Sequence, residues 1–89
     1  HVLRTSTQGA NLFQRVIAPV LGIEQDALRI ITADVGGSFG MKEFIYPEHI
    51  LVLFAAGRLS RPVKWTADRS EAFQSDLHGR DVLSHAEIA

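Results

Sequence analysis

A glycine-rich segment between a predicted strand and a predicted helix constrains the fold of this chain more than any other feature. Residues 36–40 read Gly-Gly-Ser-Phe-Gly, and they follow Leu28–Ala33, a run rich in β-branched residues that predicts a strand. Glycine adopts positive φ angles and lets backbone N–H groups approach a ligand without a Cβ in the way. The residues alone fit two interpretations, an ordinary tight turn and a concavity of amides that binds an anion.

The segments before the glycine turn predict a strand followed by a helix. Val2–Ser6 predicts a short strand, and Asn11 is the expected N-cap of the helix. Apolar residues recur at three- and four-residue spacing over residues 12–21, which predicts one apolar helical face. Pro19 is expected to kink or shorten the last turn, and Gly22 to end the helix.

The segments after the glycine turn predict a second helix and two more strands. Ile50–Ala56 is apolar nearly all round, so this helix is expected to be buried on most faces. Val63–Thr66 alternates as a strand does, and Asp81–Ala89 predicts a last strand. Between these two strands a short helical turn is expected, with Asp68 or Ser70 as its cap.

The order of these elements predicts an α/β (or α+β) fold of β-α-β-α-β type, with about four strands and two main helices. Residues 1–89 are expected to form a single unit. A chain of this length buries about 60–65% of its unfolded surface, so its own core is marginal. The apolar second helix needs more cover than the chain supplies, and position 1 holds His1 rather than methionine. We therefore expect a partial domain of a larger subunit.

Composition excludes several classes of site. The chain has no cysteine, which excludes a thiolate metal site and a cysteine nucleophile. Its net charge is −1 with acidic and basic residues interspersed, so no nucleic-acid partner is expected. No apolar run approaches the ~20 residues of a membrane span. His49 lies in the apolar helix and is predicted to be a buried, hydrogen-bonded histidine rather than a ligand.

Known phosphate-binding patterns fit the glycine segment poorly. In the P-loop pattern a lysine and a hydroxyl residue follow the last glycine directly, but here Met41 intervenes and Glu43 stands in the hydroxyl position. The dinucleotide pattern fails because Ser38 and Met41 occupy required glycine positions. Phe39, a large aromatic between glycines, is either a plug into the core, the interpretation favoured by composition, or the wall of a ligand pocket.

Several motifs in order resemble one family. Asp34–Lys42 resembles the G-G-x-F-G-x-K segment of the molybdopterin-binding subunits of the xanthine dehydrogenase and aldehyde oxidase family, and Ser6–Gln8 resembles the S-T-Q segment upstream of it. Tyr46–Glu48 and Gly57–Arg69 resemble the helix and strand that follow. Asp68–Asp81 is most similar to the bacterial aerobic carbon monoxide dehydrogenase large chain.

The resemblance implies a molybdenum-dependent oxidoreductase. Its cofactor is molybdenum held by the dithiolene of molybdopterin, expected in the cytosine dinucleotide form, and no protein side chain ligates the metal. The reaction is oxidation of carbon monoxide or hydroxylation of an aldehyde or an N-heterocycle. Electrons pass to iron–sulfur clusters and FAD on partners, a [2Fe-2S] small subunit and an FAD-binding medium subunit, in an expected dimer of heterotrimers. The expected compartment is the cytoplasm, with the periplasm as the alternative.

The resemblance also assigns site residues. Gln8 is expected near the molybdenum, hydrogen-bonded to an oxo ligand or a cofactor group. Phe39 and Gly40 are expected to line the oxo-facing side of the site, and Gly37 and Ser38 to give the backbone its close approach.

Two questions stay open from the sequence. Glu43 faces substrate, as a glutamate does in purine-oxidising relatives, or it pairs with Lys42 or Arg69 at the surface. The family's general-base glutamate belongs to a distant segment that these residues do not include, so the 89-residue chain alone is expected to be inactive.

The alternative function is an independent α/β module that binds phosphate or a nucleotide at the glycine segment.

Overall fold

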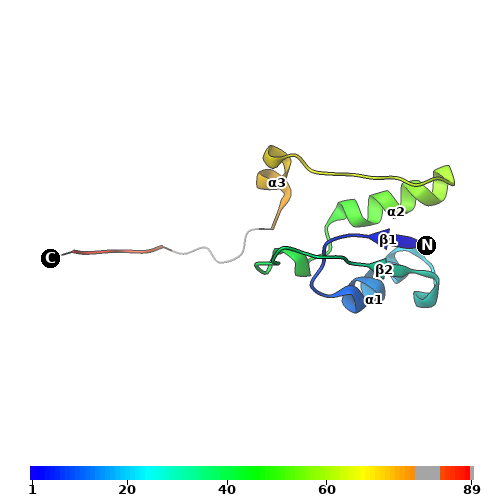
Figure 1. Cartoon of the computed structure of the whole chain (residues 1–89), viewed down its shortest axis with the longest axis horizontal. Helices are drawn as coiled ribbons and strands as arrows, with labels where there is room; N and C mark the ends of the chain where they lie inside the picture. The colour runs from blue at the N-terminus through cyan, green and yellow to red at the C-terminus, as the bar shows by residue number, and fades with distance from the viewer. Residues whose placement is uncertain (78–82, 89) are drawn as a thin grey trace.

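Two short parallel strands and the helices packed against them organise the chain. The computed structural model describes residues 1–77 and 83–88. In chain order the elements are β1 (Val2–Arg4), α1 (Ala10–Leu21), the 3-10 helix η1 (Gln25–Ala27), β2 (Arg29–Ile31), the 3-10 helix η2 (Met41–Glu43), α2 (Pro47–Leu59) and α3 (Arg69–Ser75). β1 and β2 pair in parallel, and α1 makes the crossover between them (Figure 1). This confirms the mixed α/β class.

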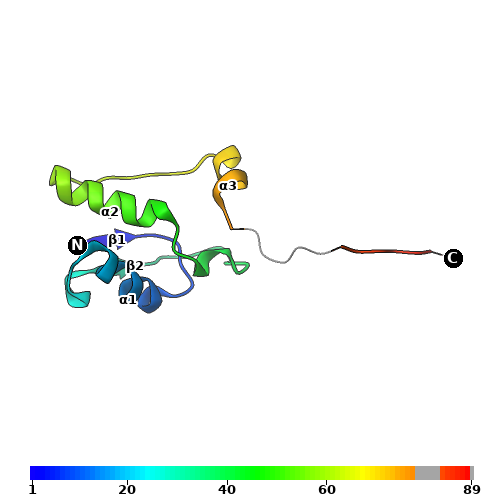
Figure 2. The same ribbon diagram turned by 180° about the vertical axis from the view of Figure 1, so that it is seen from behind.

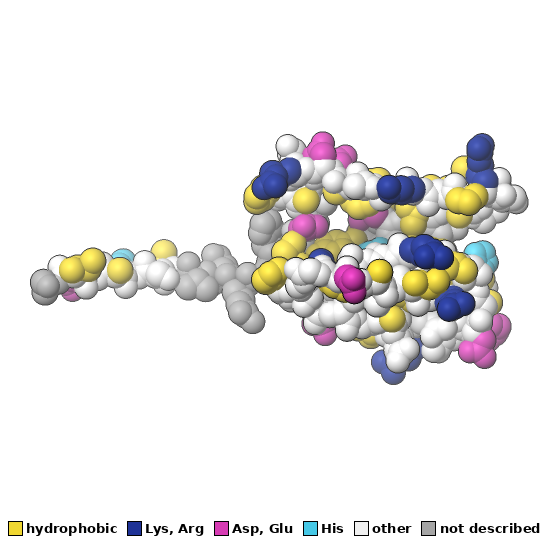
Figure 3. All heavy atoms as spheres, in the orientation of Figure 1, with side chains coloured by type: hydrophobic (Ala, Val, Ile, Leu, Met, Phe, Trp, Pro, Cys, Tyr) yellow, Lys and Arg dark blue, Asp and Glu magenta, His cyan; other side chains and the backbone are white. Residues whose placement is uncertain are grey.

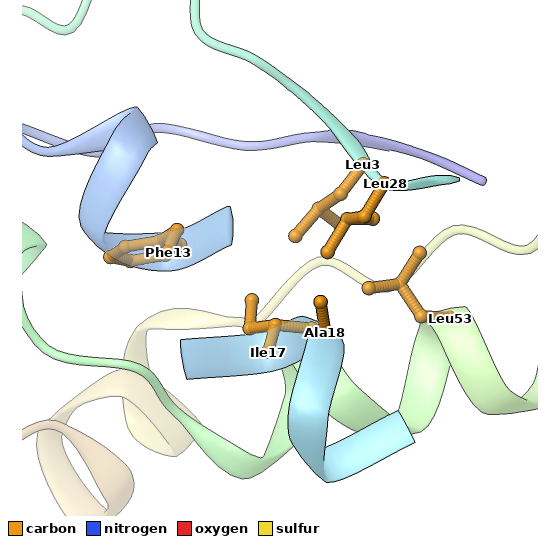
Figure 4. Packing of buried hydrophobic residues seen from close by; sticks show 6 residues of the cluster. All are labelled: Leu3, Phe13, Ile17, Ala18, Leu28 and Leu53. Atoms are coloured by element: carbon orange, nitrogen blue, oxygen red, sulfur yellow. The ribbon is translucent and has the colours of Figure 1, made fainter. Parts of the chain in front are cut away.

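The core lies on one face of the strand pair. Leu3 of β1 stands opposite Ile30 of β2, and alternation along the strands puts both side chains on the same face. Helices α1 and α2 both bury residues against this face (Figure 4). The buried hydrophobic residues are Leu3, Phe13, Ile17, Ala18, Leu28 and Leu53. Full burial of a large apolar side chain contributes about 1.5–3 kcal/mol, so this small cluster is the main stabilising term.

Helix α1 has the predicted apolar face but begins two residues earlier than predicted. Phe13 and Ile17, one turn apart, are fully buried. Asn11 as N-cap is wrong: the helix starts at Ala10, and Gly9 is the N-cap without a side-chain bond. Pro19 lies inside the helix near its end, where the chain continues helical to Leu21. Gly22 ends it as predicted, with φ of 67° and its N–H bonded to the Pro19 carbonyl at 3.1 Å.

Fewer strands form than the sequence predicts. The described residues contain one sheet of two strands, and Val63–Thr66 pairs with neither. The prediction for this segment is wrong because alternation alone does not supply a hydrogen-bonding neighbour. Of the predicted last strand, residues 81, 82 and 89 lie outside the described residues, and residues 83–88 are not in a strand. After α2 the chain runs back along that helix to α3 in both views (Figures 1 and 2).

Helix α2 is much less buried than its composition predicts. Leu53 is buried, but Leu51 is 60% exposed and Phe54 is 59% exposed. Only one side of α2 meets β1 and α1, and the described residues supply no second layer over its other side. The expectation of burial on most faces is therefore wrong for this chain. Among the described residues, no helix has the length and apolar character needed to cross a bilayer.

The cap of α3 is Asp68, one of the two residues that the sequence predicts for it. Asp68 accepts a hydrogen bond from the Glu71 N–H at 2.8 Å, and the Glu71 carboxylate accepts from the Asp68 N–H at 2.8 Å. This reciprocal pair satisfies two N–H groups that the first turn leaves without partners.

His49 ties the start of α2 to the end of β1. Its Nδ1 accepts a hydrogen bond from the Tyr46 N–H at 3.0 Å, and its Nε2 lies 3.2 Å from the Thr5 hydroxyl oxygen. The ring meets Phe13 edge-on with centroids 5.0 Å apart. Burial lowers the pKa of His49 below its usual value, against an opposing contribution from Glu48. The hydrogen bonds predicted for His49 are present, and its side chain is partly rather than fully buried.

Protonation of His49 is expected to destabilise the fold. A protonated Nδ1 cannot accept from the Tyr46 N–H, so the charged form loses this bond, worth about 1 kcal/mol. Because the pKa is lower in the folded than in the unfolded state, the stabilisation is complete above the unfolded pKa of about 6.5 and is lost as pH falls through the folded value. Urea unfolding of the chain at a series of pH values from neutral to acidic measures this loss.

A matched pair of variants assigns the effect to His49. His49→Asn keeps an acceptor near the Tyr46 N–H but does not titrate, so the dependence on pH in this range should shrink. His85→Asn, at an exposed position, should leave it unchanged. An unaltered pH profile in His49→Asn would contradict the assignment.

Candidate functional site

The candidate site lies where the two strands end. Because β1 and β2 are parallel, their carboxyl ends lie at the same end of the sheet. The pairing extends past β1 through the Thr5 N–H, which donates to the Ile31 carbonyl at 3.1 Å. Beyond it the Thr7 N–H donates to the Thr32 hydroxyl at 3.3 Å. The segment holding Gln8 and the segment leading to the glycine turn therefore leave the sheet side by side.

The buried side chain of Thr7 fixes the path of the Gln8 segment. Thr7 is 2% exposed, and its hydroxyl donates to the Lys42 carbonyl at 3.1 Å. The same hydroxyl oxygen accepts from the Gly9 N–H at 3.0 Å. The Gln8 N–H donates to the Lys42 carbonyl as well, at 3.1 Å. Two neighbouring residues thus bond to one carbonyl on the far side of the glycine turn.

The side chain of Lys42 holds the glycine turn. Its ammonium donates to the carbonyls of Val35 and Gly37, each at 2.6 Å. Hydrogen bonds from a charged donor are shorter and stronger than neutral ones, and these two pull the carbonyls inward. Lys42 therefore joins both segments, the Gln8 segment through its carbonyl and the glycine turn through its ammonium.

Positive φ angles explain the glycines of the turn. Gly36, Gly37 and Gly40 have φ of 65°, 99° and 80°. A Cβ on Gly37 would meet only the ring of the exposed Phe39, which can move aside, so the positive φ rather than lack of space favours glycine at this position. The Met41 N–H donates to the Ser38 carbonyl at 3.0 Å and closes the turn.

Phe39 faces solvent instead of the core. Its side chain is 88% exposed, and its backbone has φ of 53°, an uncommon value for a residue with a Cβ. The interpretation of Phe39 as a core plug is therefore wrong. The ring lies over Gly37, since the tight turn directs it back across its own loop.

Two further predicted residues lie at the surface. Gln8 is exposed, and its side-chain amide forms no hydrogen bond with any residue that the structure describes. Glu43 is also exposed. The alternative pairing of Glu43 with Lys42 or Arg69 is not formed among the described residues, and the Lys42 ammonium bonds to the loop carbonyls instead. The structure thus brings the backbone of Gln8 to the glycine turn and leaves the Gln8 amide and the Phe39 ring available to a ligand.

Sequence reasoning missed three residues that shape the site. These are Thr7, Lys42 as a link between the two segments, and Tyr46, whose hydroxyl donates to the Met41 carbonyl at 2.9 Å. A cation two residues after a glycine turn was the one available signal, because the turn exposes carbonyls that need donors. The bond between Thr7 and Lys42 spans 35 residues and leaves no local pattern.

The groups that the Gln8 segment and the glycine turn offer are neutral. They are the Gln8 amide, backbone N–H groups of a glycine turn and an aromatic ring, while the nearest cation is engaged internally. Within residues 1–77 and 83–88 no cluster of three histidine, cysteine or acidic residues is placed to hold a metal ion. Neutral amide and backbone N–H donors suit a ligand that carries negative charge, as molybdopterin does. The residues present therefore fit a molybdopterin-type cofactor.

Comparison with known proteins agrees with this fit. Residues 1–89 match the molybdopterin cofactor-binding domain family. The chain is 37% identical over 76 residues to the 6-hydroxypseudooxynicotine dehydrogenase complex subunit gamma of Paenarthrobacter nicotinovorans, covering 85% of this chain and 10% of that protein. It is 34% identical over 84 residues to the carbon monoxide dehydrogenase large chain of Hydrogenophaga pseudoflava, covering 94% of this chain and 10% of that protein.

A third relative is named for a different substrate. The chain is 31% identical over 86 residues to the aldehyde oxidoreductase molybdenum-binding subunit of Escherichia coli, covering 97% of this chain and 12% of that protein. No solved structure was found to match the chain. The chain spans about a tenth of the length of these curated relatives. It belongs to the molybdopterin cofactor-binding domain family, and within that family to the large molybdenum-binding subunits related to xanthine dehydrogenase and aldehyde oxidase.

Proposed function

We propose that this chain contributes cofactor-contacting loops to the large subunit of a molybdenum hydroxylase. The complete enzyme is an oxidoreductase that oxidises carbon monoxide or hydroxylates an aldehyde or an N-heterocycle. The observation that carries the proposal is the pairing of the Gln8 segment with the glycine turn through Lys42. The family match over residues 1–89 supports the cofactor class.

We propose a role for each of the expected site residues. The Gln8 amide has two N–H donors and one acceptor, so it binds an oxygen of the cofactor or orients a water without adding charge. The turn at Gly37 and Ser38 brings backbone close to the cofactor, and Phe39 with Gly40 forms the wall beside it. Molybdopterin, when bound, supplies the redox chemistry, and the protein supplies binding and orientation.

The substrate is not encoded in this segment. Relatives named for 6-hydroxypseudooxynicotine, carbon monoxide and an aldehyde are between 31% and 37% identical to this chain over the aligned residues. Because relatives named for different substrates have comparable identity to this chain, we propose that this stretch serves the cofactor that the relatives have in common. We propose that Phe39 and the exposed Glu43 face the substrate space, with Glu43 tuning specificity rather than setting the substrate class.

The remaining features of the complete enzyme are proposed from the family. The cofactor is the cytosine dinucleotide form, and electrons leave to [2Fe-2S] clusters on a small subunit and FAD on a medium subunit. The complex is a dimer of heterotrimers in the cytoplasm. The relative named as subunit gamma of a dehydrogenase complex supports a multi-subunit arrangement.

The alternative, a phosphate- or nucleotide-binding module, has less support. A P-loop lysine directs its ammonium to phosphate, whereas the Lys42 ammonium already bonds to two loop carbonyls. Titration of the chain with ATP and with inorganic phosphate, followed by Trp65 fluorescence, distinguishes the two. Saturable binding tighter than about 10 µM, roughly −7 kcal/mol, would favour the module.

Gln8→Ala in the complete enzyme is expected to retain the cofactor and lose turnover. The variant removes a hydrogen-bond donor to an oxygen that is charged or becomes charged during the reaction. Such a bond contributes about 1.5–3 kcal/mol, so its loss corresponds to a roughly 10- to 150-fold fall in kcat. Molybdenum content and steady-state kinetics measure the two quantities on one preparation. Gln74→Ala, on the exposed side of α3, is the control. Wild-type kcat in Gln8→Ala would contradict the role of Gln8.

Lys42→Met is expected to release the glycine turn. The variant keeps an unbranched side chain but leaves the carbonyls of Val35 and Gly37 without this donor, at a cost of about 1–3 kcal/mol in the free energy of unfolding. Urea unfolding of the 89-residue chain measures the cost, and molybdenum content of the complete enzyme should fall as well.

Lys64→Met is the matched control for Lys42→Met. Lys64 is exposed, so its removal should leave both quantities unchanged. Equal stability of the two variants would show that the Lys42 bonds do not hold the turn.

A further inference from the structure

Thr7 carries a buried hydroxyl directly beside Gln8. In the part of the chain that the structure describes, it is the one polar residue that is buried, and the residues on either side, Ser6 and Gln8, are exposed. Burial of a hydroxyl costs free energy, and the hydrogen bonds of this one to Lys42 and Gly9 offset that cost. Thr7 is thus held within the fold, while Gln8 next to it is open to a ligand.

The backbone of Thr7 is anchored to the end of β2. Its N–H donates to the Thr32 hydroxyl at 3.3 Å, and that hydroxyl donates to the Thr7 carbonyl at 3.4 Å. Thr32 directly follows β2, so these bonds continue the pairing of the two strands beyond Arg4 and Ile31. The side chain of Thr7 therefore starts from a fixed backbone, and its branched Cβ restricts the direction of the hydroxyl further.

The two bonds of the Thr7 hydroxyl enclose Gln8. The hydroxyl oxygen accepts from the Gly9 N–H at 3.0 Å, two residues on, which closes a turn with Gln8 at its centre. The hydroxyl donates to the Lys42 carbonyl at 3.1 Å, the same carbonyl to which the Gln8 N–H donates. Gly9 is in turn the N-cap of α1. One hydroxyl therefore holds the backbone on both sides of Gln8, and the Gln8 side chain leaves this turn in a set direction.

A neutral amide depends on its direction more than a charged group does. Attraction between charges extends over several ångström, whereas a hydrogen bond weakens steeply outside a narrow range of distance and angle. On the face drawn in Figure 3, Lys and Arg side chains are interspersed with Asp and Glu, so that face has no patch of one sign to hold a ligand. The Gln8 amide bonds to no residue that the structure describes, so its direction comes from its backbone.

We propose that Thr7 is the positioning residue for Gln8, and that its hydroxyl directs the Gln8 amide toward the oxygen that this amide binds on the cofactor. The inference rests on the role proposed for Gln8. Thr7 is 2% exposed, so it acts through its neighbour and not on a ligand. A shift of about 1 Å in a group that acts on the reacting atoms lowers a rate by up to roughly 100-fold, so a buried residue that sets this position controls turnover.

Thr7→Val in the complete enzyme tests the proposal. The variant keeps the branched shape and removes both hydroxyl bonds, so kcat per bound molybdenum should fall about tenfold with little change in KM or in molybdenum content. Thr7→Ser keeps a hydroxyl within reach of Lys42 and Gly9 and should retain kcat within about threefold of the wild type. Thr66→Val, the same change at an exposed position, is the control and should leave kcat unchanged.

A double-mutant cycle separates positioning from a general structural role. If Thr7 acts through Gln8, Thr7→Val should lower kcat by less than about twofold once Gln8→Ala is present, whereas independent effects would multiply. Thr7→Ala, which also removes the hydroxyl, gives the same comparison where Thr7→Val does not assemble.

Three results would overturn the inference: wild-type kcat in Thr7→Val, an equal loss in Thr7→Ser, or a full further loss in the Gln8→Ala background. Each of them leaves the role of Gln8 standing, provided that Gln8→Ala alone lowers kcat. Wild-type kcat in Gln8→Ala would instead contradict the proposed function of that residue, and the inference about Thr7 would fall with it.

Discussion

The parallel pairing of β1 and β2 is the constraint on which the rest of the structure depends. Three residues of each strand pair in register, and the buried face of α1 holds the crossover between them. An antiparallel arrangement would place Gln8 and the glycine turn at opposite ends of the sheet. The parallel arrangement places both at the carboxyl ends, where the chain leaves the ladder and its backbone is free to bind a ligand. The location of the site thus follows from strand direction before any side chain is considered.

Lys42 converts this proximity into a fixed geometry. A turn with several positive φ angles has few internal bonds, so its carbonyls need donors from elsewhere. A lysine supplies three donors on a compact ammonium, and two of them bond to Val35 and Gly37. With these carbonyls drawn toward Lys42, the outer side of the turn is left to the ring of Phe39 and to backbone N–H groups. The Lys42 ammonium bonds within the loop, so the Gln8 segment and the glycine turn expose neutral groups.

Local patterns predicted the elements whose determinants are local. The spacing of Phe13 and Ile17, the stop at Gly22 and the cap at Asp68 all depend on residues within one or two turns. The proximity of Gln8 to the glycine turn was expected from family resemblance, and composition alone supported a core position for Phe39. The bond from Thr7 to Lys42 joins residues 35 apart, so no window of the sequence contains it.

The two wrong predictions about burial and pairing have one cause. The apolar pattern of α2 indicates that this helix requires a packing surface, and the alternation of Val63–Thr66 indicates that this segment requires a neighbouring strand. Neither pattern says whether that partner lies within the same 89 residues. At the site the requirement is met internally, because the bonds of Thr7, Gln8 and Lys42 all join residues of this chain that the structure describes. The free edge of β1 and the bonds that join the Gln8 segment to the glycine turn therefore lie in different parts of the structure. A change that closes the edge of β1 should leave the bonds that join the Gln8 segment to the glycine turn intact.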